Sequence, residues 1–533
     1  MDRATVHQRR WRILAVLCLS LIIIGMDNLI LSLALPSVQQ DLQADGSQLQ
    51  WIVDSYTLAF GGLLLLGGGL GDRFGRRLML LAGLTAVLGF SIGAAYAGSA
   101  EMLIAMRAGM GVGGAFVMPA TLSIIKDVFP REEQAKAISV WAGSGAIGVP
   151  LGPVLGGLLL ENYWWGSVFL LAVPVVLAAI IAVLAIVPES RNPGRTKFDL
   201  VGVLLSVGGL GALVYGLIEA PHYGWDDPLP LSIMAGGVLG IVLFVLWEKK
   251  SSAPMLPPSL FRSPAVGGSA VAMFCVNFCL FGLLFGVSQY FQFVNGHGPL
   301  ASGLRLLPVL TAIAGAPMGQ KLAEKFGLRF VAVVGLIVLA ASMVTMAAAD
   351  GAGESLVLVA LALFGFTMGF TIPACANTIL ASAPDEQGGA ASGLTDATLQ
   401  VGGSLGIAVM GSVLATSYRD GLPNLVGVLP PEASAAVQDS LGGANEVARR
   451  IGGDSGHGLM ELVSPAFVSA LTDAMLVGGA VAVGGVLVAA LLLPSRKAQA
   501  AANTRPEHEI ELPNSPTVTL PDRRPVGSVS EER

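Results

Sequence analysis

Residues 67–77 read GGGLGDRFGRR, and residues 319–329 read GQKLAEKFGLR. Each segment follows a long apolar run, and each carries an acid, a base, a phenylalanine and a glycine in the same register. An arginine stands two residues after the glycine in both segments. So many aligned features make two unrelated basic loops a poor explanation. The sequence therefore predicts an internal duplication, with one copy of the loop in each half of the chain.

The composition is that of a membrane protein. Of the 533 residues, 53% are hydrophobic and only 12% are charged, against ~25% in soluble domains. With a mean hydropathy of +0.72, this excludes a soluble enzyme, a disordered chain and a nucleic-acid binder. The 69 glycines follow no Gly-X-Y period and indicate closely packed helices. The four cysteines lie in apolar runs and indicate neither a disulfide framework nor a metal site.

Apolar runs long enough to cross a bilayer recur along the whole chain. A transmembrane helix needs ~20 mostly apolar residues. Fourteen runs meet this length: 13–35, 49–70, 78–96, 102–125, 137–160, 168–187, 200–218, 229–247, 265–293, 301–322, 330–349, 356–381, 390–415 and 465–493. The first run is too long, and too many others follow it, for a cleaved signal peptide. The expected fold class is an all-α polytopic membrane protein with 14 transmembrane helices (6+2+6) and two pseudo-symmetric six-helix halves.

The basic residues predict the orientation of these helices. Lysine and arginine collect in cytoplasmic loops. Most of the 30 basic residues fall in alternate loops when the N-terminus is placed inside, and the short outer loops carry none. Both termini are therefore expected in the cytoplasm. The protein itself is expected in the plasma membrane of a bacterial cell.

The expected organisation follows from the runs and their connections. Residues 432–451, within the long outer loop, are expected to form a surface helix. The charged, proline-containing tail is expected to be disordered. The predicted parts are a cytoplasmic N-terminus at 1–12, an N-terminal six-helix bundle at 13–190, two additional helices at 198–250, a C-terminal six-helix bundle at 258–494 with the outer loop 417–464, and the cytoplasmic tail at 495–533.

Several motifs resemble those of the major facilitator superfamily. Residues 68–77 match its signature loop, and Asp27 lies in a stretch similar to a first-helix motif. Arg107 and its following glycines resemble the fourth-helix motif, and residues 148–157 resemble the fifth-helix motif of exporters. The likeness runs from about residue 27 to residue 493. It implies the major facilitator fold, in which a substrate site lies between duplicated halves.

The finer likeness is to the fourteen-helix drug:proton antiporters, the group of quaternary-ammonium and multidrug exporters. Any one of its motifs is a weak signal, and their order along the chain makes the signal specific. The stretches similar to this group in particular are 51–56, 198–202 and 259–262.

The resemblance assigns roles to two groups of residues. In the family the signature loop latches one state of the cycle, with its acid at the positive end of a neighbouring helix. The alternative interpretation is a topology signal, which the arginines also provide but which does not explain Asp72, so the family match favours the latch. This predicted latch comprises Gly68, Asp72, Arg73, Gly75, Arg76 and Arg77. The antiporter motif lets helices approach closely at small residues and is expected to form a bent seam between the halves; it comprises Gly148, Gly152, Pro153, Gly156 and Gly157.

Charged residues inside the spans are the candidates for proton coupling. A charge at the bilayer centre costs ~2.5–3.5 kcal/mol on insertion scales, so it has a function or a partner. Burial of a carboxyl group favours its neutral form, which allows proton exchange. The candidates are Asp27, Asp54, Arg107 and Asp396. Arg107 is either the partner of Asp27 or extends outward. Asp54 either acts in coupling or lies at the interface near Trp51, and Asp396 stands where the family often has asparagine.

Polar residues in the late spans are candidates for a substrate cavity. A hydrophobic cavity needs a few polar groups to orient its ligand. The candidates are Asn277, Gln289, Tyr290, Gln292, Asn377 and Gln400. Amide side chains also join membrane helices to one another, so contact with substrate and interhelical bonding both remain open.

The expected function is proton-coupled export of lipophilic, cationic drugs or antibiotics by alternating access. The proton gradient would supply the energy, with no cofactor, no metal and no nucleic-acid partner. The partners would be small lipophilic substrates, protons and membrane lipids, and the protein would be a monomer. The alternatives are a dedicated exporter of a self-made metabolite, a proton-coupled importer and a polytopic membrane enzyme. The enzyme is disfavoured because all five histidines fall in tails or loops, outside the spans.

Overall fold

The computed structural model describes residues 3–190, 199–251, 254–256, 259–349, 353–383, 388–423 and 429–494, and this part of the chain contains no β-strand. The N-terminal half comprises α1 (Arg3–Leu42), α2 (Gly46–Phe74), α3 (Arg76–Ala95), α4 (Ala100–Val128), α5 (Arg131–Asn162), α6 (Ser167–Leu170) and α7 (Ala172–Ile186). Two additional helices follow, α8 (Leu200–Tyr223) and α9 (Pro228–Lys250).

The C-terminal half begins with a short 3-10 turn, η1 (Leu260–Arg262). Its longer elements are α10 (Pro264–Gln289), the π-helical η2 (Tyr290–Val294), α11 (Pro299–Arg305), the 3-10 helix η3 (Leu307–Thr311), α12 (Ala312–Phe326), α13 (Leu328–Ala347), α14 (Glu354–Ala381), α15 (Gly388–Gly421), α16 (Pro431–Asp439), α17 (Leu441–Ile451) and α18 (Gly453–Leu492).

Every predicted apolar run falls on helix, so the all-α fold class is confirmed. Within the described residues, 11 helices are long and apolar enough to cross a membrane, and one bent pair within α1 would raise this number to 12. Helices α2 and α5 are not among them. The count of fourteen transmembrane helices therefore stays a prediction.

The duplicated loops have the same backbone geometry. Gly75 joins α2 to α3 with φ +122°, and Gly327 joins α12 to α13 with φ +91°. Each glycine N–H donates to a carbonyl four residues earlier, at 3.0 Å from Gly75 N to Gly71 O and 2.9 Å from Gly327 N to Ala323 O. Positive φ angles favour glycine because they bring no Cβ clash. The shared glycine in the two sequences therefore marks the same sharp turn between two helices.

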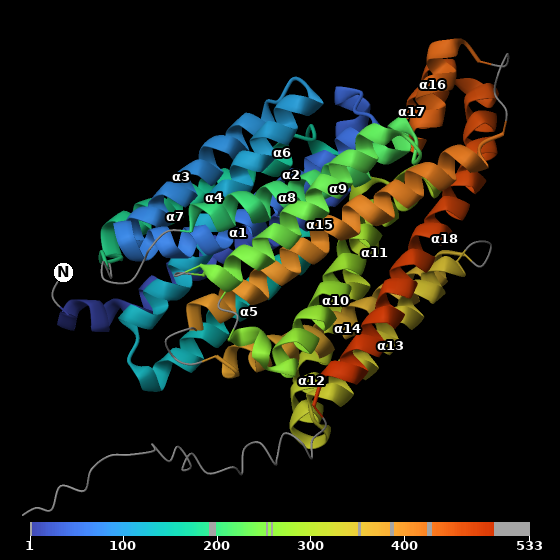
Figure 1. The fold of residues 1–533 in the computed structure, drawn as a ribbon. Coiled ribbons are helices and arrows are strands. Elements are labelled where there is room, and N and C mark those ends of the chain that lie inside the picture. The colour runs from blue at the N-terminus through green and yellow to red at the C-terminus, as the bar shows by residue number, and fades with distance from the viewer. Residues whose placement is uncertain are drawn as a thin grey trace, which may run out of the picture.

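The two halves pack their helices in corresponding ways. In the N-terminal half α1 packs on α5 and α2 on α4, and in the C-terminal half α10 packs on α15 and α12 on α14. The outer pairs also correspond, α3 with α7 and α13 with α18. The two bundles lie side by side, blue to cyan and yellow to red (Figure 1). This repeated pairing supports two pseudo-symmetric halves.

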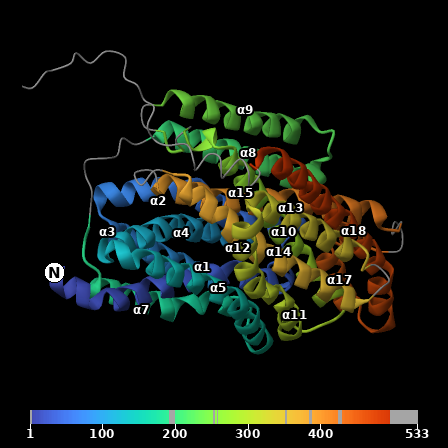
Figure 2. The same ribbon diagram turned by 90° about the horizontal axis from the view of Figure 1, so that it is seen from below.

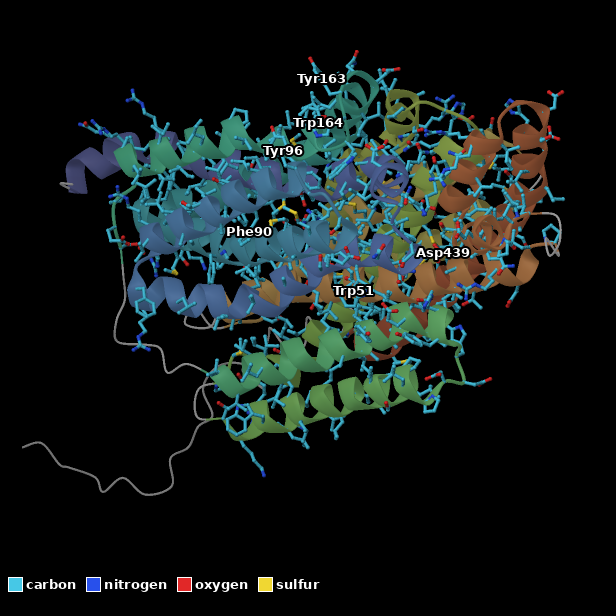
Figure 3. All side chains as sticks on the ribbon, turned by 90° about the horizontal axis from the view of Figure 1, so that it is seen from above. Trp51, Phe90, Tyr96, Tyr163, Trp164 and Asp439 are labelled. Atoms are coloured by element: carbon cyan, nitrogen blue, oxygen red, sulfur yellow. The ribbon has the colours of Figure 1, made fainter. Side chains whose placement is uncertain are left out.

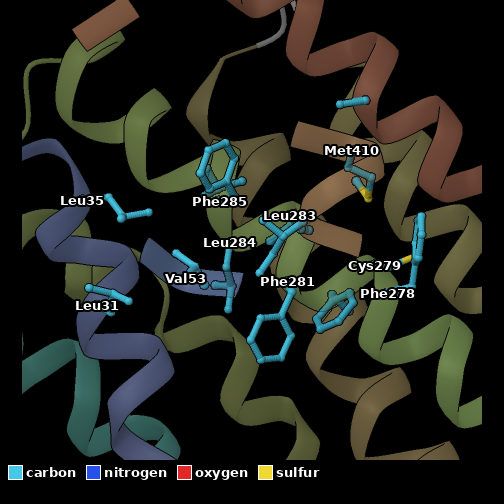
Figure 4. Packing of buried hydrophobic residues seen from close by; sticks show 14 of the residues in the cluster. Leu31, Leu35, Val53, Phe278, Cys279, Phe281, Leu283, Leu284, Phe285 and Met410 are labelled. Atoms are coloured by element: carbon cyan, nitrogen blue, oxygen red, sulfur yellow. The ribbon is translucent and has the colours of Figure 1, made fainter. Parts of the chain in front are cut away.

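The main helix pairs between the halves are α2 with α15 and α5 with α11, and α1 also contacts α10. Figure 4 shows the core near this junction, where Leu31 and Val53 of the N-terminal half lie near Phe281 and Leu284 of α10. Leu31 is 1% exposed, and one hydrophobic cluster extends across both halves. The halves thus share a core.

Helices α8 and α9 lie outside both bundles, at one edge of the molecule (Figure 2). Helix α8 packs on α2 and on α15, so it contacts both halves. Trp51 Nε1 donates to Glu219 Oε1 at 3.3 Å on the α2 side, and Ser412 Oγ donates to Leu217 O at 2.6 Å on the α15 side. Figure 3 shows Trp51 on the side of the bundle that faces these two helices.

The predicted outer loop is mostly helical, and the expectation of one surface helix at 432–451 is wrong. Two helices stand there, α16 and α17, because Ser440 is extended and caps α17 by accepting from Gly443 N at 3.2 Å. We call this pair the outer hairpin. Helix α18 already begins at Gly453, before the predicted end of the loop.

The outer hairpin packs on the N-terminal half as well as on α18. Gln39 Nε2 donates to Ser440 Oγ at 2.6 Å, and both side chains are buried. Gly46 N donates to Asp439 Oδ2 at 3.0 Å. A segment from the C-terminal half therefore packs against the end of the molecule that carries the α1–α2 turn.

Aromatic side chains gather at the same end of the N-terminal half. Tyr96, Tyr163 and Trp164 lie together there (Figure 3), and the rings of Tyr96 and Trp164 are 6.2 Å apart. Tyr96 is 65% exposed although it is a large aromatic residue. Tyrosine and tryptophan concentrate at membrane–water interfaces, so this cluster is typical of the edge of a bilayer.

Candidate functional site

Asp27 and Arg107 form a buried ion pair between α1 and α4. Arg107 Nη1 donates to Asp27 Oδ2; the arginine side chain is fully buried, and that of Asp27 is 14% exposed. Arg107 Nε donates to Ile52 O at 3.1 Å, and its guanidinium lies 4.4 Å from the centre of the Tyr56 ring. Arg107 is expected from the sequence either to pair with Asp27 or to extend outward, and in the structure it pairs with Asp27.

Asp54 lies on another face of α2 from the residues that hold Arg107. Its side chain is fully buried and its Oδ1 accepts from Thr57 Oγ1 at 2.8 Å. Helical periodicity places Asp54 on the face of Gln50 and Gly61, which pack against α15. Asp54 is thus inside the protein at the junction of the halves. Its position relative to the membrane interface near Trp51 stays a prediction.

The four proton-coupling candidates do not form one cluster. Asp27 and Arg107 lie within the N-terminal half, whereas Asp54 lies where α2 meets α15. Asp396 is half-buried on α15, one helical turn before Gln400, whose side chain packs on Gly61 of α2. The candidates therefore lie at two separate places, one inside a half and one between the halves.

The amide side chains proposed for a substrate cavity mostly bond to backbone. Gln292 Nε2 donates to Leu33 O of α1 at 3.0 Å, which joins the halves. Asn277 Nδ2 donates to Leu399 O of α15, and Gln289 Nε2 donates to Phe285 O of its own helix at 3.1 Å. In this conformation these amides are engaged with protein.

Of the other cavity candidates, Tyr290 and Gln400 are buried and Asn377 is exposed. The ring of Tyr290 lies 5.6 Å from that of Phe291. The structure therefore does not gather the six cavity candidates around one space.

The signature loop is fastened to its own half by two arginines. Arg76 forms an ion pair with Asp127 at the end of α4, and Arg77 Nη2 donates to Leu184 O of α7 at 2.7 Å. The guanidinium of Arg73 lies 5.4 Å from the ring of Phe74. The side chain of Asp72 lies outside the described part of the chain, so its role in the latch stays a prediction, and Gly68 lies on α2 in that loop.

The antiporter motif serves two contacts of α5. A Cβ on Gly148 would lie 2.6 Å from Ile22 O of α1, and Gly156 also faces α1. On the other side a Cβ on Gly157 would lie 2.6 Å from Leu300 Cα of α11, and Pro153 O lies 2.4 Å from the Cβ position of Gly303. The small residues thus allow α5 to touch both its own half and the opposite half; Gly152, between them, is buried.

Sequence reasoning did not identify the groups that hold Arg107. Tyr56 and the carbonyl of Ile52 are supplied by α2, and only their place in the motif at 51–56 singled out this stretch. Among the residues that the structure describes, no group of three or more His, Cys, Asp or Glu is placed to hold a metal ion. What the arrangement offers chemically is proton exchange and charge recognition.

The sequence matches a known family and several characterised proteins. The Major Facilitator Superfamily matches residues 17–407. The tetracenomycin C resistance and export protein of Streptomyces glaucescens is 36% identical over 524 residues, 95% of this chain and 95% of that protein. The multidrug efflux pump LfrA of Mycolicibacterium smegmatis is 36% identical over 487 residues, 90% of this chain and 96% of that protein.

A further relative and a solved structure extend this likeness. The methyl viologen resistance protein SmvA of Salmonella typhimurium is 31% identical over 470 residues, 86% of this chain and 93% of that protein. The inward-facing, unoccupied structure of a bacterial homolog to the human lysosomal transporter Spinster superposes with a TM-score of 0.63 at 16% identity. The superposition covers 91% of this chain and 99% of that chain. At this identity the likeness supports the fold alone.

Proposed function

The chain belongs to the major facilitator superfamily, and on that premise we propose that it exports drugs or antibiotics in exchange for protons. Its relatives over nearly the whole length are resistance, export and efflux proteins. It is a multi-span transporter of this superfamily and not an enzyme. The proposal includes a monomer in the plasma membrane of a bacterium, with both termini cytoplasmic, no cofactor, and protons and membrane lipids as partners.

The single observation that carries proton coupling is the pair of Asp27 with the fully buried Arg107. An ionised Asp27 balances the charge of Arg107, and a proton on Asp27 leaves that charge unbalanced in a medium of low dielectric constant. A positively charged substrate then experiences net repulsion. Protons that arrive from outside and neutralise Asp27 or Asp54 would therefore lower the affinity for the substrate and favour its outward release.

Lipophilic cations are the proposed substrate class. The spans are apolar, and Asp27, Asp54 and Asp396 bring negative charge into them. One relative is named for resistance to methyl viologen, which is a dication. An acid in an apolar site selects for a compound that carries positive charge on an apolar body.

A drug-susceptibility panel tests the function. Cells that express the chain are compared with cells that carry the empty vector, with and without an uncoupler. The expected result is resistance to several lipophilic cations that the uncoupler abolishes. Sensitivity equal to that of the vector control for every compound would contradict the proposal.

A dedicated exporter of a self-made metabolite is the second candidate. It is favoured by the relative named for tetracenomycin C resistance and export. In the same panel it predicts resistance to one structural class only. An importer would instead raise sensitivity to a toxic substrate, so the sign of the effect separates it from both exporters.

A further inference from the structure

The short helix α11 is the part of the C-terminal half that touches the antiporter motif of α5. A Cβ on Gly157 would lie 2.6 Å from Leu300 Cα and 3.1 Å from Pro299 O. Further along, Pro153 O lies 2.4 Å from the Cβ position of Gly303. Figure 2 shows α5 and α11 side by side. Contacts this close tolerate little displacement, so this junction of the halves depends on where α11 is held.

One acid of α14 holds α11 at both of its ends. His297 lies in the turn two residues before α11, and its Nε2 is 2.9 Å from Glu354 Oε2. Arg305 is the last residue of α11, and its Nε donates to the other carboxylate oxygen of Glu354. We call His297, Arg305 and Glu354 the α11 clamp. It lies within the C-terminal half and fixes the helix that contacts the other half.

The turn that carries His297 also belongs to a second contact between the halves. His297 N donates to Phe291 O of η2 at 3.0 Å. In the same η2, Gln292 Nε2 donates to Leu33 O of α1 at 3.0 Å. A displacement of this turn therefore acts on the bond from Gln292 to α1 and on the contact of α11 with α5.

His297 is the member of the clamp that can change its charge near neutral pH. Its side chain is 24% exposed and that of Glu354 is 29% exposed, so water reaches both. Histidine is the side chain that ordinarily changes charge between about pH 5 and pH 8. A neutral imidazole donates one hydrogen bond to Glu354, whereas the protonated ring donates a stronger, charge-assisted one. A proton on His297 therefore tightens the clamp.

The other charges on the neighbouring elements lie apart from His297 or are engaged elsewhere. Glu161 of α5 comes near, with its Oε1 3.9 Å from the Cβ position of Gly298. On α1, Asp27 is paired with Arg107 and Asp41 is exposed, while α10 and η3 carry no charge. The charged residues of α17 pair with one another or bond to Gln40, and those of α18 are exposed. These last two groups are Glu446, Arg449 and Arg450 of α17, and Asp454, His457, Glu461 and Asp473 of α18.

We propose that the α11 clamp positions α11 for its contact with α5, and that a proton on His297 favours this contact. Because the clamped arrangement binds that proton more tightly than a loosened one, the contact is favoured at low pH and weakens as the pH rises. The inference goes beyond the proposed function, since it concerns the movement of the halves and holds whatever compound is carried.

Distances between spin labels test the clamp on the purified full-length chain in lipid nanodiscs. The labels are placed at the exposed residues Asn162 of α5 and Leu304 of α11, and the four native cysteines are buried. Other acids titrate as well, so the informative quantity is the part of the pH response that His297→Gln loses. His457→Gln, at an exposed histidine of α18, is the matched control.

The ratio of short to long distances should fall as the pH rises from about 5.5 to about 8. This fall should be roughly two- to fivefold smaller in His297→Gln than in His457→Gln, as expected for one partly exposed ion pair. Glu354→Gln should lose the same share of the response. His297→Lys keeps its charge throughout this range and should retain the short distance at the higher pH.

Two outcomes would overturn the proposal. An equal pH response in His297→Gln and His457→Gln would show that His297 takes no part in it. A distance in His297→Lys that lengthens with pH as in the unmodified chain would show that the charge at this position does not hold α11. Both His297 variants leave Arg305 bonded to Glu354, so they decide the matter even if Glu354→Gln does not fold.

Discussion

Arg107 of α4 reaches across to Asp27 of α1, and the arginine is fully buried while the aspartate remains 14% exposed. The pair is therefore asymmetric. The acid is the more accessible member, and the base is enclosed by protein. The base is also held by Ile52 O and by the Tyr56 ring, so its position does not depend on the acid alone.

Replacement of Asp27 by asparagine should abolish proton-driven export. The asparagine keeps the shape of the side chain and cannot exchange a proton, so the uptake of substrate into inverted vesicles should no longer respond to a pH gradient. Asp473→Asn on the exposed face of α18 is the control and should transport like the wild type. Normal gradient-driven uptake by Asp27→Asn would exclude it as the proton carrier.

Removal of Arg107 should destabilise the protein more than removal of the whole pair. Arg107→Leu leaves Asp27 without its buried partner. Removal of one member of a buried ion pair lowers the free energy of unfolding by about 3–5 kcal/mol. The double variant Asp27→Leu/Arg107→Leu leaves no unpaired charge and should recover most of that loss. Thermal unfolding in detergent measures both. Equal melting temperatures for the single and double variants would show that the pair is not coupled in stability.

Gly157 should be required for the close approach of α5 to α11. A Cβ there would lie 2.6 Å from Leu300 Cα, so Gly157→Ala must separate the two helices or shift the backbone. Transport should fall roughly tenfold, equivalent to about 1.4 kcal/mol, with expression retained. Gly236→Ala on α9, where an added Cβ meets nothing within 4 Å, is the matched control. Wild-type transport in Gly157→Ala would show that this contact can be loosened without effect.

The two duplicated glycines should respond alike to alanine. Gly75 and Gly327 both have positive φ, where a side chain costs about 1–2 kcal/mol. The atoms nearest to a Cβ on Gly75 belong to the carboxyl end of the exposed Glu189 side chain, which can move away, so Gly75→Ala and Gly327→Ala should lose similar amounts of stability. Gly89→Ala, inside α3 with free space around it, should instead stabilise the protein by up to ~1 kcal/mol. Thermal unfolding of the three variants should give this order, and a stabilised Gly327→Ala would contradict the shared geometry.

Docking of the outer hairpin should strengthen as the pH falls. Burial, and then the nearby charge of Asp45, raise the pKa of Asp439, although Arg419 of α15 opposes this shift. The docked carboxyl therefore holds its proton more tightly than an undocked one, so docking is favoured at low pH and weakens as the pH rises through the raised pKa. Spin labels on the exposed residues Asp41 and Glu432 should report a longer distance at alkaline than at acidic pH.

Asp439→Asn should remove most of this pH dependence. Asp454→Asn, at an exposed acid near the start of α18, should retain it. The same pH response in Asp439→Asn as in the unmodified chain would assign the effect to another group.

Much of the fold is predictable because apolar runs and turn glycines determine the local conformation of their own segment. Apolar runs of spanning length become helices, and the aligned Gly75 and Gly327 adopt the same turn. The break of the outer hairpin at Ser440 is not predictable from the sequence, because residues 432–451 are compatible with one helix. In the structure Ser440 caps α17 and its hydroxyl also accepts from Gln39 of the N-terminal half.

The candidate site is less predictable because partners are chosen by tertiary packing. The sequence allowed Arg107 either to pair with Asp27 or to extend outward, and the contact of α1 with α4 decides between them. Gln292 can donate hydrogen bonds either to a substrate or to another helix. Its bond to Leu33 O depends on the packing of the other half, which the sequence of its own helix does not specify. A cavity within the N-terminal half has no sequence signal, since it is a mostly apolar space between faces of six helices, α1, α3, α4, α5, α6 and α7.

Helix α8 has a mechanical consequence for the whole transporter. It is bonded to α2 through Glu219 and Trp51, and to α15 through Leu217 and Ser412. When the halves separate at that end, one of these two attachments must slip or break, because a rigid helix cannot follow two bodies that move apart. Helix α8 thus acts as a brace between the two halves along the edge where α2 meets α15.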